Sequence, residues 1–144
     1  MKFQPAALAL VSVIVRGASA QSASRPAAVA PPTGTWRGTS TCLVHRSACH
    51  DEIVVYRITP MHAADSVTVD ARKIVGGEEQ EMGVLACRFT SSSGRLTCSI
   101  PRGVWSFTVR EDSLTGDLRL SDNTRFRDVR TARDRTRSDR HEHR

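Results

Sequence analysis

The chain has 144 residues, of which 5% are aromatic and 25% are charged, and its formal net charge at pH 7 is +6. Residues 34–124 carry ten basic and eleven acidic side chains, whereas residues 125–144 carry eight arginines and four acids. A nucleic-acid-binding domain keeps its basic residues on a folded face, with aromatic residues among them. This distribution of charge therefore argues against nucleic acid as a partner.

The N-terminal end has the pattern of a secretory signal peptide over residues 1–20. A run of apolar and small residues from Ala6 to Val15 is followed by a small-x-small cleavage site that ends at Ala20. The run is too short to cross the membrane as a helix, which needs about 20 residues. We therefore expect cleavage near Ala20 and a secreted or periplasmic protein with no membrane span.

The rest of the chain divides into three segments by composition. Residues 21–33 are rich in proline and alanine and contain no aromatic residue, which predicts a linker. Residues 34–129 are predicted to form the only domain. In residues 130–144 arginines alternate with acids, which is typical of a solvated segment, and we predict a disordered charged tail.

The predicted domain shows alternation of apolar and polar residues and almost no helical periodicity. Turn residues interrupt the alternation about every 8–12 residues, as in antiparallel sandwiches and barrels. We predict an all-β fold, a small antiparallel up-and-down β-barrel of about eight strands. The candidate strands are residues 35–43, 52–59, 66–75, 82–90, 95–100, 104–110, 113–120 and 124–129.

One hairpin determines its own register. If residues 91–94 form a four-residue turn with its glycine in the left-handed position, Phe89 lies opposite Leu96 and Cys87 lies opposite Cys98. This register places every large apolar residue of the hairpin on one face. A shift by one residue would mix apolar and charged residues on both faces.

The next hairpin behaves in the same way. A tight turn at residues 111–112 places Phe107 opposite Gly116 and Trp105 opposite Leu118, all on one face. The glycine suggests either that the phenyl ring covers bare backbone or that the strand bends.

The first hairpin is less regular. If Cys42 lies opposite Cys49, Trp36 pairs with Val55, and Ile53 points inward with them. The second strand is apolar on both faces, so we expect its outer face to be covered by the linker, a loop or a partner.

Four cysteines in an exported domain of this size predict two disulfides. Register and proximity favour the pairs Cys87–Cys98 and Cys42–Cys49 over the crossed connectivities. Residues 42–50 also hold two histidines at a spacing typical of zinc ligands. Because export favours oxidation, we interpret this segment as a stapled loop and predict neither a metal nor a cofactor.

Catalytic residues would require a nucleophile near a base and an orienting group. Ser91, Ser92 and Ser93 have no histidine nearby in the sequence. The acidic residues Glu78, Glu79 and Glu81 follow two glycines, as in a solvated hairpin tip. We therefore predict that the protein is not an enzyme.

Two segments carry a resemblance to a known group of proteins. Gly34-Thr35-Trp36 resembles the opening strand of the calycin superfamily, which includes the lipocalins, fatty-acid-binding proteins, avidins and small bacterial protease inhibitors. In those proteins the tryptophan closes one end of the barrel under a basic residue of the last strand. The resemblance implies that Trp36 closes this barrel under Arg125 or Arg127. Residues 34–42 together with residues 51–56 also resemble small exported bacterial proteins.

The resemblance and the aromatic interior lead to two hypotheses. The first is a non-enzymatic, lipocalin-like binding protein that holds a small apolar ligand near one mouth of the barrel. Its candidate contacts are Trp36, Phe89, Trp105 and Phe107. The alternative is a protein-interaction or inhibitor domain that acts through a barrel edge, through loops or through the strand at residues 53–58. Since an eight-stranded barrel can be filled by its own side chains, an empty cavity would favour the ligand and a filled core the partner.

Overall fold

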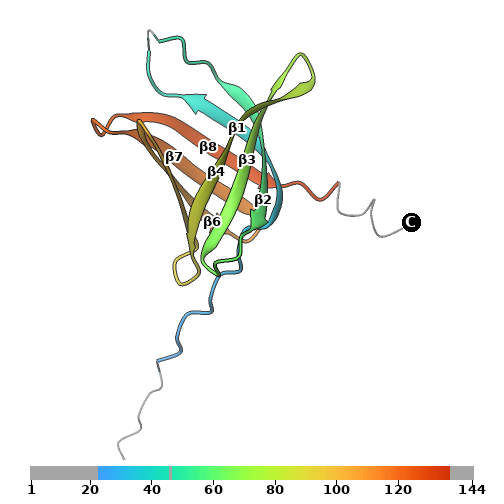
Figure 1. Cartoon of the computed structure of the whole chain (residues 1–144), viewed down its shortest axis with the longest axis vertical. Coiled ribbons are helices and arrows are strands. Elements are labelled where there is room, and N and C mark those ends of the chain that lie inside the picture. The colour runs from blue at the N-terminus through green and yellow to red at the C-terminus, as the bar shows by residue number, and fades with distance from the viewer. Residues whose placement is uncertain (1–22, 46, 137–144) are drawn as a thin grey trace, which may run out of the picture.

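A computed structural model describes residues 23–45 and 47–136 (Figure 1). Eight antiparallel strands each pair with the next, and the last returns to the first, which confirms the predicted all-β up-and-down barrel. The described residues include no helix long and apolar enough to cross a membrane. The strands are β1 (Gly34–Cys42), β2 (Glu52–Pro60), β3 (Ser66–Val75), β4 (Glu78–Thr90), β5 (Arg95–Ile100), β6 (Gly103–Arg110), β7 (Ser113–Leu120) and β8 (Arg125–Arg133).

The folded part is longer at its C-terminal side than predicted. β8 continues to Arg133, beyond the expected end of the domain at residue 129. Its last residues form the seam with β1, where Ala132 pairs with Arg37 and Arg133 pairs with Trp36. The predicted signal peptide and residues 137–144 of the predicted tail lie outside the described residues.

The segment before β1 is more than a linker. Val29 packs against the core, and its backbone N–H donates to the carbonyl oxygen of Ser91 at 2.8 Å. Pro32 is fully buried. Proline and valine side chains add apolar area without much rotamer entropy to lose, so these residues can cover the end of the barrel from which the blue N-terminal segment leaves in Figure 1.

The two hairpins that determine their own register are confirmed. Phe89 pairs with Leu96 across β4 and β5, and Phe107 pairs with Gly116 across β6 and β7. Gly94 has the expected positive φ, 67°. A Cβ atom on Gly116 would lie 2.7 Å from Cδ1 of Phe107, so the ring does cover bare backbone.

The predicted register of the first hairpin is wrong by one residue. Trp36 pairs with Tyr56, not with Val55. Val54 and Tyr56 therefore join the interior, whereas Ile53 points outward and is 47% exposed. The prediction treated the disulfide as a cross-strand pair, but Cys49 lies in the loop before β2 and constrains only that loop.

Both predicted disulfides are confirmed. Cys42 is bonded to Cys49 in the loop between β1 and β2, and Cys87 is bonded to Cys98 between β4 and β5. The first bond occupies both thiols of the alternative zinc site. The second is buried within the core. Two disulfides are typical of an oxidising, extracytoplasmic compartment.

The interior is filled at one end of the barrel and open at the other. Near the entry of the N-terminal segment the side chains are buried, with Trp36, Ile58 and Leu96 at most 2% exposed. At the opposite end lie the disulfide loop and the β3–β4 hairpin, which extends beyond the rim (Figure 1). This open mouth is where the structure leaves room for another molecule.

Candidate functional site

The open mouth leads into a cavity of about 260 Å³ inside the barrel. Its walls come from seven strands, all except β7, and are mainly apolar. On β6 the rings of Trp105 and Phe107 are stacked with centroids 5.7 Å apart, and Tyr56 on β2 meets Phe107 edge to face at 5.9 Å. The other apolar lining residues are Val69, Ala71, Met82, Leu85, Cys98 and Ile100.

The shape of the cavity follows from how β4 meets its two neighbours. The ladder between β4 and β5 has only three residue pairs, from Arg88 to Thr90 on β4. Towards the mouth no strand among the described residues pairs with β4 on that side, and a shift in the β3–β4 register at Ala71/Arg72 adds one residue to β4. Such a bulge bends the strand. Because Gly83 has no side chain, the part of the wall that β4 forms leaves the neighbouring interior unfilled.

One side of the cavity is polar and charged. Nη1 of Arg127 donates to the hydroxyl of Ser40 at 3.0 Å and lies 3.5 Å from Oε2 of Glu52. The other carboxylate oxygen of Glu52 is 3.4 Å from Nζ of Lys73. The Arg127 and Glu52 side chains are only 13% and 19% exposed. Arg127 and Glu52 line the cavity and their charges cancel, whereas Lys73 lies beside Glu52 without lining the cavity.

Tyr56 lies between the apolar and the charged parts of the wall. Burial raises the pKa of its hydroxyl well above the ordinary value, although Arg127 acts in the opposite direction. No side chain in residues 23–45 and 47–136 hydrogen-bonds this hydroxyl. Since no fully buried side-chain oxygen or nitrogen of these residues lacks a partner, the hydroxyl reaches the space of the cavity and can donate to a molecule there.

The raised pKa predicts a loss of stability at alkaline pH. The unfolded chain releases the tyrosine proton near pH ~10, whereas the folded chain retains it. The contribution of Tyr56 to folding is therefore present below that pH and is lost as the pH rises above it. The free energy of unfolding of the wild type, measured with denaturant, should decline between about pH 9.5 and 11.5. The decline should be shallower in Tyr56→Phe.

A spectroscopic control is available because the chain has a single tyrosine. The tyrosinate absorbance of the native protein should lag behind that of the urea-unfolded protein as the pH rises. Coincident titration curves would contradict the assignment of a buried hydroxyl.

The structure separates the four predicted ligand contacts into two pairs. Trp105 and Phe107 line the cavity. Trp36 and Phe89 are buried in the filled end of the core and do not reach it. Tyr56 was not among the predicted contacts, because only the observed register of β2 turns it inward.

The predicted closure of the barrel involves a different arginine. The guanidinium of Arg133 lies 4.3 Å from the centre of the Trp36 ring, so the pairing of Trp36 with Arg125 or Arg127 is wrong. Arg125 points outward into ion pairs, and Arg127 lines the cavity. Arg133 was assigned to the tail because its segment, Arg133-Asp134-Arg135, has the alternating charges of a solvated chain.

Trp36 itself is held by the segment before β1 and by β8 at the closed end. Its indole Nε1 donates to the carbonyl oxygen of Pro32 at 2.8 Å. Nη1 of Arg133 donates to the carbonyl oxygen of Thr33 at 2.6 Å, which ties the segment before β1 to β8. Trp36 therefore closes the barrel and does not contact the cavity.

Comparison with known proteins adds no assignment. No protein-family model, curated protein or solved structure matches this chain. The function must therefore be argued from the cavity and the surface of the barrel.

Proposed function

We propose that this protein is a non-enzymatic, exported binding protein, lipocalin-like in its architecture, which holds a small apolar molecule in the open mouth of the barrel. The cavity that Trp105 and Phe107 line carries this proposal. A dry, apolar cavity of about 150 Å³ is enough to bind benzene. The 260 Å³ found here suits a compact molecule of one or two rings.

The polar wall adds one requirement on the ligand. The Tyr56 hydroxyl, which can donate into the cavity, and the Arg127 guanidinium beside it favour an acceptor or an anionic group at one end of an otherwise apolar body. Both oxygens of Glu52 already face cations. We therefore assign this carboxylate to orienting Arg127, and not to proton transfer.

A matched pair of variants tests the proposal. Ala71→Phe adds a ring inside the cavity, whereas Ala86→Phe makes the same change on the exposed outer face of β4. In titrations with indole, naphthoate and anilinonaphthalene sulfonate, the fluorescence of Trp105 should respond in a saturable way. We expect Ala71→Phe to weaken binding at least about tenfold, because the new ring fills the part of the cavity that a ring of the ligand would occupy. Ala86→Phe should bind as the wild type does.

Two results would count against a ligand in the cavity. One is the absence of any saturable change across the panel in the wild type. The other is equal binding by Ala71→Phe and the wild type, because the probe would then be bound elsewhere.

A protein-interaction or inhibitor function is the second candidate, and one observation favours it. Beyond its three pairs with β5, the strand β4 presents an unpaired edge, and Met82 and Val84 beside it are 42% and 57% exposed. An extended segment of another protein could add to such an edge as a further strand. If the probes fail to bind while the fold is intact, this edge becomes the preferred site.

A further inference from the structure

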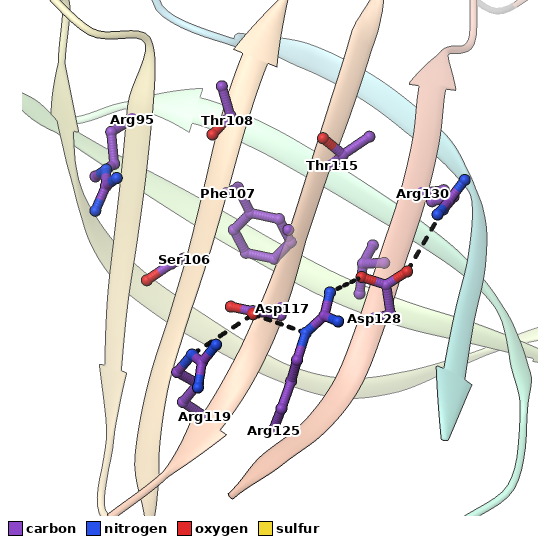
Figure 2. Close-up of a pocket in the computed structure, with 12 residues that line it drawn as sticks. Arg95, Ser106, Phe107, Thr108, Thr115, Asp117, Arg119, Arg125, Asp128 and Arg130 are labelled. Carbon is purple, nitrogen blue, oxygen red and sulfur yellow. Dashed lines mark hydrogen bonds and ion pairs between the residues drawn. The ribbon is translucent and has the colours of Figure 1, made fainter. Parts of the chain in front are cut away.

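The outer face of the barrel carries a second hollow, which the sheet separates from the cavity inside; Phe107, between the two, belongs to the lining of both. It lies over β5, β6, β7 and β8 and measures about 740 Å³ (Figure 2). Its outward-facing side chains are hydroxyl-bearing or charged. We call it the arginine groove; its outward-facing residues are Arg95, Ser106, Thr108, Thr115, Asp117, Arg119, Arg125, Asp128 and Arg130.

The strand register arranges these side chains in rows across the four strands. Arg95 pairs with Thr108, Thr108 with Thr115, and Thr115 with Arg130. Figure 2 shows this row with an arginine at each end and two threonines between them. Three strand spacings separate the ends, so the two arginine backbones lie about 14 Å apart.

The wall formed by β7 and β8 is a ladder of alternating charges. Nε of Arg125 lies 3.0 Å from Oδ2 of Asp117, and its Nη2 donates to Oδ1 of Asp128 at 2.7 Å. Arg119 and Arg130 extend the ladder at its two ends, 3.7 Å from Asp117 and 3.4 Å from Asp128. The aspartates hold the arginines in place, and each guanidinium has five N–H donors, more than the ladder occupies.

The opposite wall has a cation with no acidic partner. No carboxylate among the described residues pairs with Arg95, and Figure 2 shows its side chain apart from the ladder. Four arginines and two aspartates leave the groove with a charge of +2. Both walls thus attract anions, and the floor between them offers hydroxyl groups.

We propose that the arginine groove binds an acidic polysaccharide. Guanidinium groups pair with carboxylates or sulfates through two parallel N–H donors, and the threonine floor can exchange hydrogen bonds with sugar hydroxyls. A protein partner usually needs an apolar or aromatic anchor at the centre of the site, and single-stranded nucleic acid needs aromatic rings on which its bases stack. The outward-facing residues of the groove are of neither kind. Exported proteins meet such polymers outside the cytoplasm.

The test compares two double variants of equal charge in the full chain. Arg95→Gln with Arg130→Gln removes the cations at both ends of the threonine row and leaves Arg125 with its two aspartates. Arg25→Gln with Arg57→Gln removes the same charge from the segment before β1 and from β2. Binding is measured by calorimetry at low salt with polygalacturonate, dextran sulfate, neutral dextran and poly-glutamate.

We expect the wild type to bind polygalacturonate or dextran sulfate but not dextran, with an affinity that falls as salt is added. The groove variant should bind at least about tenfold more weakly, and the control variant as the wild type does. Which of the two polymers binds more tightly identifies the anionic group. The proposal is overturned if neither acidic polymer binds, if both double variants lose affinity equally, or if poly-glutamate binds more tightly than either polysaccharide. Because the cavity lies on the other face of the sheet, failure here leaves the apolar-ligand proposal untouched.

Discussion

Replacing Trp36 with alanine should lower the free energy of unfolding by about 3–5 kcal/mol, because a fully buried indole leaves a cavity at the closed end of the barrel. The change also removes the hydrogen bond to Pro32 and the ring under Arg133. The segment before β1 and the end of β8 should loosen together. Urea unfolding followed by circular dichroism measures the effect.

Trp105→Ala is the matched control, since its ring lines the open cavity and is only partly buried. We expect a smaller loss of stability there and a larger loss of probe binding. If Trp105→Ala destabilises the barrel as much as Trp36→Ala, the division into a closed and an open end is wrong.

Gly38→Ala should lower the free energy of unfolding nearly as much as Trp36→Ala does, although it adds only one methyl group. An added Cβ atom would lie 1.9 Å from the carbonyl oxygen of Arg130 and 2.7 Å from Cα of Thr131. Both atoms belong to the backbone of β8, which is hydrogen-bonded to β1 and cannot move aside without opening the barrel. We expect a loss of about 3 kcal/mol or more, at the upper end of overpacking effects.

Gly76→Ala separates this steric effect from the general cost of replacing a glycine. Gly76 has a φ of 59° in the β3–β4 turn, and nothing lies within 4 Å of an added Cβ atom. There the free energy of unfolding should fall only by the strain of an alanine in the left-handed conformation, about 1–2 kcal/mol. Equal losses at the two glycines would show that β1 and β8 do not approach as closely as described.

The two proposed sites lie on opposite faces of the same wall. β6 contributes Trp105 and Phe107 to the cavity inside and Ser106 and Thr108 to the groove outside. This follows from the alternation of side chains along a strand. The proposed small molecule and the proposed acidic polymer would therefore bind on opposite faces of one wall, and the two sets of variants test each site separately.

Local pattern alone determined much of the fold. Alternation and turn residues predicted all eight strands, and short turns set the β4–β5 and β6–β7 registers because a slip would expose the apolar face. The Cys87–Cys98 bond followed from that register. The first hairpin has neither a short turn nor a single apolar face to set its register. Its connection is long, and β2 carries apolar residues on both faces, so either register buries a comparable apolar set.

The functional features depend on contacts between distant parts of the chain. Arg133 reaches Trp36 only because β8 closes on β1, and alternating charge near the C-terminus cannot distinguish a strand from a solvated tail. The cavity exists because β4 bulges and parts from β5, which no local pattern reveals. The arginine groove combines residues of four strands. Their spacing in the sequence does not indicate a common site, because only the strand register places them side by side. Local hydrophobic pattern decides which residues face inward, whereas strand closure and bulges decide which of them leave space.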